Sequence, residues 1–125
     1  MHLRCKRIYD APAPADGFRV LVDRLWPRGI TKERAALDLW AKEVAPSTKL
    51  RTAFHRGDLG WDAFAEAYDA EISVNPAVTA LRETLQGHET VTLLYSVNDA
   101  EHNHALLLGR VLTSADGTRP GRTAG

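Results

Sequence analysis

The segment Thr90–Ser96 (Thr-Val-Thr-Leu-Leu-Tyr-Ser) constrains the fold more than any other part of the chain. It is β-branched at its start and almost wholly apolar, so neither side of a strand built from it would suit water. Such a run is typical of a central strand that is covered on both faces, as strands of parallel sheets are. Because parallel strands need long crossover connections, the segment predicts an α/β protein.

Two further strands are expected, at Leu3–Tyr9 and Phe18–Asp23, separated by a loop rich in Pro and Gly at residues 11–17. The 125 residues suit a single domain. We therefore predict a small, mostly parallel sheet of about three to four strands flanked by helices, with the domain over residues 1–112. Residues 113–125 are rich in Ser, Gly, Pro and Arg, and we expect them to form a disordered tail.

Helices are expected wherever apolar residues recur at steps of three and four. A helix after Thr31 would extend as far as Trp40, although residues 36–40 also fit an extended conformation. Ser47 is a good N-cap for the next helix, which Gly57 would end. Three more helices are predicted: one carrying Trp61, Phe64, Tyr68 and Ile72, one that begins at Pro76 and is capped by Gly87, and a last one capped by Asn98 or Asp99.

Composition excludes several classes of protein. No apolar run is long enough to span a membrane, and the start of the chain does not resemble a secretion signal. The single cysteine, Cys5, cannot form an internal disulfide, so a cytoplasmic, reducing location is expected, with Cys5 as a small core residue. The net charge is zero, yet residues 1–34 carry eight basic against four acidic side chains. This local excess permits a small anionic ligand, or a nucleic acid held at one face.

Polar residues follow both of the best strands. Those after the strand at Phe18–Asp23 begin with Asp23 itself, and those after Thr90–Ser96 with Ser96. If the two strands are parallel neighbours, their carboxyl ends lie side by side, where open α/β sheets bind ligands. The two groups are Asp23, Arg24, Trp26 and Arg28, and Ser96, Asn98, Asp99, Glu101, His102, Asn103 and His104.

These residue types predict a pocket that accepts a phosphate or nucleotide. Guanidinium groups form paired hydrogen bonds with phosphate, and imidazole transfers protons near neutral pH. The expected anion-binding residues are Arg24, Arg28, Lys6, Arg7 and Asn103, and the candidates for catalysis are His104, Asp99 and Asp23. Lys42 and Arg51 could extend the same site. The glycine-rich phosphate loops of nucleotide-binding folds are absent, so the sequence names no cofactor.

Each of these residues also has a structural interpretation. Asp23 could simply pair with Arg24 or Arg28 and fix the loop, and Trp26 could be a packed anchor. His102 and His104 are two residues apart, which on a helix points them in different directions, so no metal site is expected. His104 could instead hydrogen-bond at a helix start, and the hydroxyl of Ser47 is explained by capping.

Several motifs of the chain occur together in a recognisable order: Lys6-Arg7-Ile8-Tyr9, the segments 19–29, 39–47 and 92–95, Asp99, and Asn103-His104-Ala105. In these motifs the chain resembles, from about residue 3 to residue 112, the YeaO-like family of small bacterial proteins, catalogued as domain of unknown function 488. The resemblance implies a compact bacterial α/β protein of the cytoplasm. The family has no established activity to transfer. The matching residues are Lys6, Arg7, Asp23, Arg24, Trp26, Arg28, Lys42, Ser47, Arg51, Tyr68, Asp99, Asn103 and His104, and His102 is not among them.

Three hypotheses follow from the sequence. The leading one is an anion pocket at the carboxyl ends of strands 18–23 and 90–96, in a binding protein or an enzyme for a phosphate-bearing small molecule. The second is a nucleic-acid-binding module that uses the basic N-terminal third, with Trp26 or Tyr9 as stacking surfaces. The third is a structural or interaction protein whose charges pair internally. Neither a membrane partner nor a particular oligomeric state is indicated.

Overall fold

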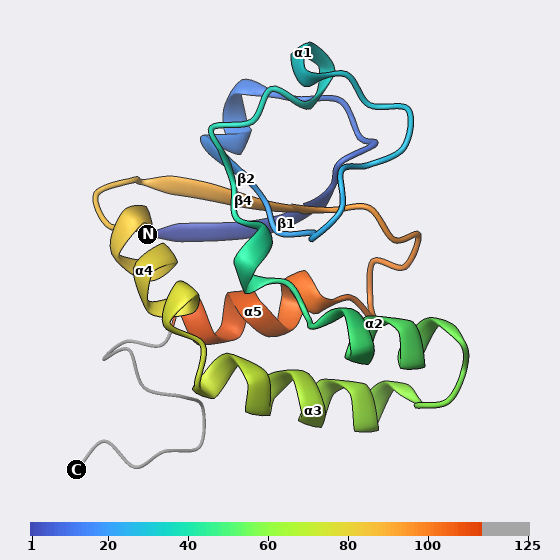
Figure 1. The fold of residues 1–125 in the computed structure, drawn as a ribbon. Helices are drawn as coiled ribbons and strands as arrows, with labels where there is room; N and C mark the ends of the chain where they lie inside the picture. Colours follow the sequence, from blue (N-terminus) through green and yellow to red (C-terminus); the bar gives the residue numbers. More distant parts are fainter. Residues whose placement is uncertain (114–125) are drawn as a thin grey trace, which may run out of the picture.

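A parallel sheet with the strand order β1-β4-β2-β3 forms the centre of the computed structural model, which describes residues 1–113 (Figure 1). The strands are β1 (His2–Arg7), β2 (Phe18–Leu21), β3 (Leu39–Trp40) and β4 (Thr90–Tyr95). All three pairings are parallel. The apolar strand β4 lies between β1 and β2, and its residues 91–95 are buried. The predicted fold class, a small sheet with helices and parallel strands, is therefore confirmed.

Helices cover the two faces unequally. On one face lie α2 (Thr48–His55), α3 (Trp61–Ser73), α4 (Pro76–Leu85) and α5 (His104–Leu112) (Figure 1). On the other lie only η1 (Pro14–Asp16), α1 (Lys32–Ala35) and the chain around them. A third short turn, η2 (Lys42–Val44), leads into α2. None of the helices in residues 1–113 is long and apolar enough to cross a membrane.

Local sequence signals explain where the helices begin. Thr31, Ser47, Asn75 and Asn103 each accept a backbone N–H from the first turn of the helix that follows. The predicted caps at Thr31 and Ser47 are confirmed, and Pro76 occupies the first turn of α4. The predicted cap of α5 was wrong: Asn103 fills that position, while the Asp99 carboxylate accepts the backbone N–H groups of Glu101 and His102 in a preceding turn.

The helix predicted after Thr31 is present but much shorter than predicted, and within residues 36–40 the extended alternative is correct for Leu39 and Trp40. The helix stops at Ala35 because Ala36 has a left-handed backbone (φ 48°). Leu39 and Trp40 then pair with Val20 and Leu21. The pairing with β2 gives this segment backbone partners, since the N–H groups of Asp38 and Ala41 donate to the carbonyls of Arg19 and Leu21.

Register divides the sheet residues into two cores. Alternate residues such as Val20, Leu93 and Tyr95 face α2–α5 and form the larger core. Their neighbours Leu21 and Leu94 face the loops and form a second cluster with Ile8 and Ala35. Lys6 and Arg7 are adjacent in β1, so they lie on opposite faces. Of the expected tail, only Thr113 lies within the described residues, where it caps the end of α5.

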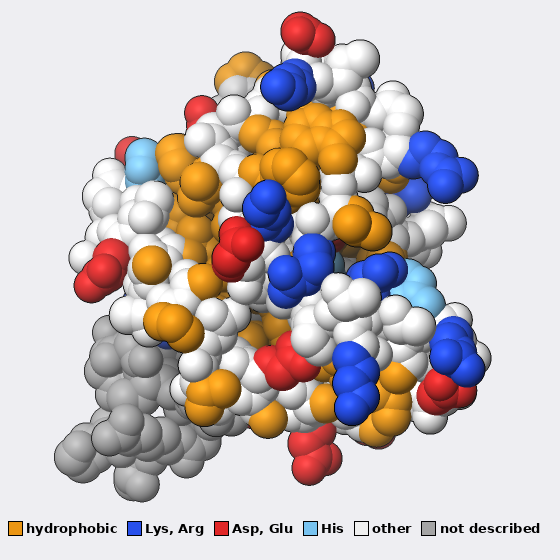
Figure 2. All heavy atoms as spheres, in the orientation of Figure 1, with side chains coloured by type: hydrophobic (Ala, Val, Ile, Leu, Met, Phe, Trp, Pro, Cys, Tyr) orange, Lys and Arg blue, Asp and Glu red, His pale blue; other side chains and the backbone are white. Residues whose placement is uncertain are grey.

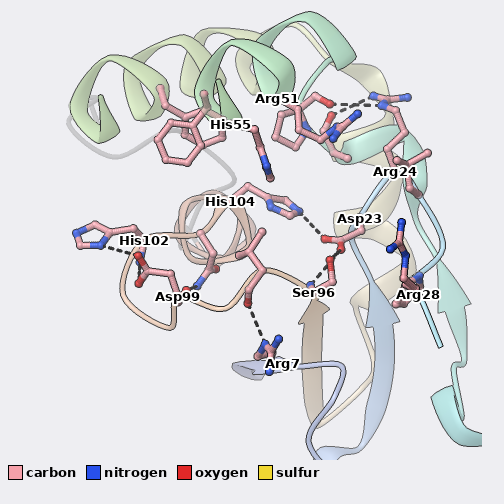
Figure 3. Close-up of a pocket in the computed structure, with 18 of the residues that line it drawn as sticks. Arg7, Asp23, Arg24, Arg28, Arg51, His55, Ser96, Asp99, His102 and His104 are labelled. Carbon is pink, nitrogen blue, oxygen red and sulfur yellow. Dashed lines mark hydrogen bonds and ion pairs between the residues drawn. The ribbon is translucent and has the colours of Figure 1, made fainter. Parts of the chain in front are cut away.

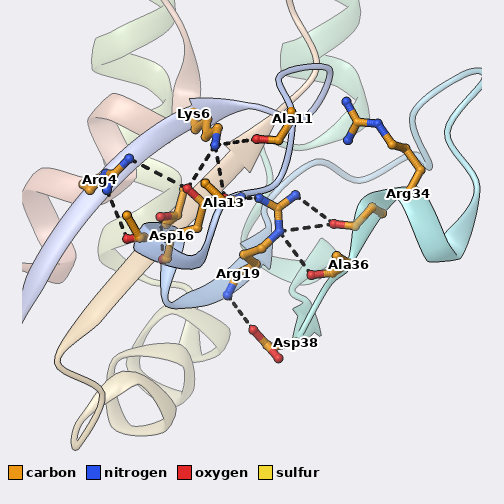
Figure 4. A network of polar contacts seen from close by, with 12 residues as sticks. Arg4, Lys6, Ala11, Ala13, Asp16, Arg19, Arg34, Ala36 and Asp38 are labelled. Atoms are coloured by element: carbon orange, nitrogen blue, oxygen red, sulfur yellow. Dashed lines mark hydrogen bonds and ion pairs between the residues drawn. The ribbon is translucent and has the colours of Figure 1, made fainter.

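A buried ion cluster holds the loops on the second face (Figure 4). The Asp16 carboxylate is inaccessible to solvent and lies 3.0 Å from Lys6 Nζ, with Arg19 Nη1 and the Ala13 N–H also donating to it. Arg19 donates further to the Ala35 and Ala36 carbonyls, at 2.8 Å and 3.1 Å. Burial by itself raises the pKa of Asp16, but these hydrogen bonds outweigh burial and lower the pKa below its usual value.

Replacing Asp16 with Asn should lower the free energy of unfolding by about 3 kcal/mol or more, because Lys6 and Arg19 lose their buried counter-charge. Urea unfolding followed by circular dichroism measures this. Asp10→Asn, at an exposed site in the same loop, is the control and should change stability by no more than about 0.5 kcal/mol. Equal effects of the two substitutions would contradict the account of the cluster.

The same carboxylate should make stability depend on acid. Since the folded pKa of Asp16 lies below its unfolded value of 3.8, its contribution is complete above that value and is lost as the pH falls through the folded pKa. Unfolding of the wild type between neutral pH and pH about 2 should therefore show a loss that is smaller in Asp16→Asn. Parallel pH profiles for the two proteins would show that Asp16 is not the group responsible.

Candidate functional site

A pocket of about 600 Å³ opens beyond the carboxyl ends of β1, β2 and β4 (Figure 3). Its walls come from residues 23–28 after β2, residues 96–104 after β4, the end of β1, and the α2 and α3 segments. Both polar groups predicted from the strand ends therefore reach one cavity. The cause is the direct parallel pairing of β2 with β4, which brings the ends of these strands side by side.

Asp23, Ser96 and His104 form the floor of the pocket (Figure 3). Asp23 Oδ2 accepts the Ser96 N–H at 3.0 Å and the Ser96 hydroxyl at 2.5 Å. His104 Nε2 lies 2.9 Å from the Val22 carbonyl and 3.3 Å from Asp23 Oδ1. Because a carbonyl only accepts, Nε2 carries the proton and directs it to Val22. Asp23 Oδ1 is buried and accepts no hydrogen bond from the described residues.

Four arginines surround this floor, and two of them are fixed by backbone carbonyls. Arg7 Nε donates to the Val97 carbonyl at 3.1 Å, and its guanidinium lies 4.8 Å from the centre of the Tyr9 ring. Arg24 donates to the carbonyls of Ala45 and Pro46, at 3.2 Å and 3.3 Å. These bonds use at most two of the five N–H groups of each side chain, so both keep donors for a ligand.

The other two arginines have no such partner. Within residues 1–113, neither Arg28 nor Arg51 makes a side-chain hydrogen bond or ion pair, and Arg51 Nε is buried. Figure 3 shows Arg51 and His55 extending from α2 towards His104, with Arg24 beside Arg51. Figure 2 shows Lys and Arg side chains gathered beside a hydrophobic patch on the face that it presents. Among the charged residues that line the pocket are four arginines and two aspartates, Asp23 and Asp99, so positive charge exceeds negative charge there.

Most of the predicted site residues line this pocket, but they differ in whether their side chains are already hydrogen-bonded within the protein. Asp23, Arg24, Arg28, Arg7 and His104 lie as described above. Asn103 also lines it, but its side chain donates to the Asp99 carbonyl and accepts the Leu106 N–H. Its amide is therefore occupied in starting α5.

Asp99 lies at the exposed edge of the pocket, and its carboxylate holds the turn 99–102 together. The hydrogen bond from the Glu101 N–H, with those from His102, lowers the pKa of Asp99. Lys6 is the predicted residue that the pocket does not include, because its side chain points to the other face and binds Asp16.

The contacts of Asp23 and Trp26 can be compared with the structural interpretations of these residues. Asp23 forms no ion pair with Arg24 or Arg28, since its partners are Ser96 and His104. Trp26 is half-buried, donates to the Ile30 carbonyl at 2.6 Å and packs edge-on against Trp40, while also lining the pocket. Residues 1–113 contain no cluster of His, Cys, Asp or Glu that could hold a metal ion.

Sequence reasoning did not place His55 and Trp61 in the pocket. The helical spacing of Trp61, Phe64 and Tyr68 predicted that all three belong to the core. Tyr68 is indeed buried: its hydroxyl donates to the Val44 carbonyl, and burial raises its pKa. For His55 a signal exists: it lies four residues after Arg51, so both project from one face of α2.

A family model described as "Inactive DUF488-N3 subclade" matches residues 2–121. The chain belongs to this DUF488-N3i family. It is 45% identical over 114 residues to the uncharacterized protein YeaO of Escherichia coli, covering 91% of this chain and 99% of that protein. It is 38% identical over 110 residues to the uncharacterized protein Rv3073c of Mycobacterium tuberculosis, covering 88% and 92%. No solved structure matches it. The resemblance to YeaO-like proteins is thereby confirmed.

Removing the Ser96 hydroxyl should destabilise the floor of the pocket. In Ser96→Ala, the largely buried Asp23 carboxylate loses one of its donors, which should cost about 1–3 kcal/mol of unfolding free energy. Ser73→Ala is the matched control, because that hydroxyl only donates to the Ala70 carbonyl at an exposed position. Thermal unfolding compares the two, and a loss no greater in Ser96→Ala than in the control would contradict the role given to this hydrogen bond.

Proposed function

We propose that this protein binds a phosphate-bearing small molecule in the pocket at the carboxyl ends of β2 and β4. The observation that carries the proposal is the pair of unpartnered guanidinium groups, Arg28 and Arg51, in a cavity that two fixed arginines also line. Arg19 shows the contrasting arrangement, since its guanidinium group is bonded to the Asp16 carboxylate and the Ala35 carbonyl.

The electrostatics of the pocket favour an anion over a cation. Asp99 is already surrounded by N–H donors, and Asp23 Oδ2 accepts two hydrogen bonds. Guanidinium forks bind phosphate oxygens in pairs, and a cavity with walls of low dielectric strengthens the attraction. The charges of Arg24 and Arg7 are fixed before binding, so less side-chain entropy is lost when the ligand arrives.

Binding without turnover accounts for the site better than catalysis does. The Ser96 hydroxyl donates to the Asp23 carboxylate and the His104 Nε2 proton is directed to Val22, so Ser96 is not paired with the imidazole that would activate it as a nucleophile. The description of the family as inactive agrees with this arrangement. Acid or base catalysis by His104, Asp99 or Asp23 stays a prediction.

The pocket also explains the basic N-terminal third better than a nucleic-acid surface does. The side chains of Lys6 and Arg19 are largely buried against the Asp16 carboxylate, so a phosphate backbone cannot readily reach them, and Arg4 also lies 3.7 Å from it. Binding of nucleic acid draws on exposed positive charge that phosphates can reach. The nucleic-acid hypothesis is therefore not adopted.

Thermal unfolding in the presence of pyrophosphate and ribose 5-phosphate tests the proposal. Either ligand at one hundred times its dissociation constant should add about 2.7 kcal/mol of stability, a rise of several degrees in Tm for a domain of this size. Arg28→Ala should abolish most of this rise. Because Arg28 is exposed and without a partner among the described residues, its loss should change unliganded stability by no more than about 0.5 kcal/mol.

Lys49→Ala is the matched control, since it removes an exposed positive charge from α2 outside the pocket. It should keep the ligand-induced rise in Tm. No rise with either ligand in the wild type would overturn the proposal. If Lys49→Ala and Arg28→Ala lost the same part of the ligand-induced rise in Tm, the rise would reflect general charge attraction, and binding in the pocket would be contradicted.

A further inference from the structure

One wall of the pocket is aromatic, and the proposed binding of phosphate does not use it. Phe54 at the end of α2 and Trp61 and Phe64 at the start of α3 all line the cavity. Their rings contact each other, with centroids 4.5 Å apart for Phe54 and Phe64 and 5.6 Å for Trp61 and Phe64. Phe64 is buried, whereas Phe54 and Trp61 are half-buried and keep part of their surface open.

His102 and Trp61 form a corner at this wall. The two ring centroids are 5.2 Å apart and the ring planes stand at 68° to each other. His102 is half exposed, yet its ring is held by Asp99, whose Oδ2 lies 3.2 Å from Nδ1 and whose Oδ1 accepts the His102 N–H. A packing contact alone does not need an exposed imidazole fixed by its own carboxylate. The arrangement presents a preformed aromatic corner to the cavity.

Helix α2 connects this corner to the cationic part of the pocket. Arg51 and Phe54 are three residues apart and Arg51 and His55 four, so all three project from neighbouring positions on one face. Such positions are separated by about 5–6 Å between Cβ atoms. A ligand that places phosphate on Arg51 therefore has the aromatic wall within reach of a short connector, and the polar floor at Asp23 and Ser96 lies beside it.

We propose, on the basis of the function proposed above, that the ligand is a nucleoside monophosphate. Its phosphate binds Arg24, Arg28 and Arg51, its pentose lies over the polar floor, and its base packs against Trp61 in the corner made with His102. A planar base suits this wall because stacking on an aromatic ring is strong and needs no particular hydrogen-bond pattern. A pocket of about 600 Å³ has the size of a small-molecule site.

Calorimetric titration with ribose 5-phosphate, adenosine and the four common ribonucleoside 5′-monophosphates tests this assignment. At least one monophosphate should bind about 5-fold or more tighter than ribose 5-phosphate, the gain that stacking of one base supplies. Trp61→Leu should remove that gain and leave the affinity for ribose 5-phosphate unchanged. Trp61→Phe, which keeps an aromatic face and guards against a folding defect, should retain most of it.

Phe18→Leu is the matched control, because Phe18 also stacks on a histidine, His88, but does not line the pocket. It should bind all the ligands as the wild type does. Equal affinity for ribose 5-phosphate and every monophosphate, in the wild type and Trp61→Leu alike, would overturn the nucleotide assignment and leave phosphate binding intact. Failure of ribose 5-phosphate, pyrophosphate and the monophosphates to bind would overturn both.

Discussion

Two hydrogen bonds from Ser96 to Asp23 join the ends of the paired strands β4 and β2, and the geometry of the pocket depends on this contact. It fixes where the chain leaves each strand. Residues 24–28 consequently turn over one side of the pocket and residues 97–103 over the other. His104 adds a bond from the first turn of α5 to Val22, at the end of β2. Asp23, Ser96 and His104 therefore join the ends of β2 and β4, connect the start of α5 to them and form the floor of the pocket.

The two buried carboxylates, Asp16 and Asp23, differ in whether they form ion pairs with the basic side chains of the N-terminal region. Asp16 is surrounded by Lys6, Arg19 and a backbone N–H, so it uses positive charge for the fold. Asp23 accepts hydrogen bonds through one oxygen, has His104 3.3 Å from the other and forms no ion pair with Arg24 or Arg28, which leaves these guanidinium groups available. The alternation of strand side chains produces this difference, because Lys6 is directed to Asp16 and its neighbour Arg7 to the pocket.

The sequence was sufficient where one local signal decided the outcome. The apolar run of β4 predicted the parallel sheet, and the polar residues after β2 and β4 predicted which strand ends would meet. It was insufficient where tertiary contacts decided. Leu39 and Trp40 became a strand because β2 offered them a partner, and Asn103 replaced Asp99 as the cap of α5 because Asp99 was used in the turn before it. The sequence could not show that Arg7 lines the pocket and Lys6 does not, because this depends on the contact of Lys6 with Asp16. Trp61 had the spacing of a core residue, although it also lines the pocket.

Arginine side-chain NMR would show whether the guanidinium groups of the pocket bind an anion. Nε–H resonances would be followed while pyrophosphate is added at constant ionic strength. We expect saturable shifts for Arg28 and Arg51, with Arg19, which is bonded to Asp16 and does not line the pocket, unchanged. If all three resonances moved together without saturating, or if none moved, pyrophosphate would have no specific site in the pocket and the account would be contradicted.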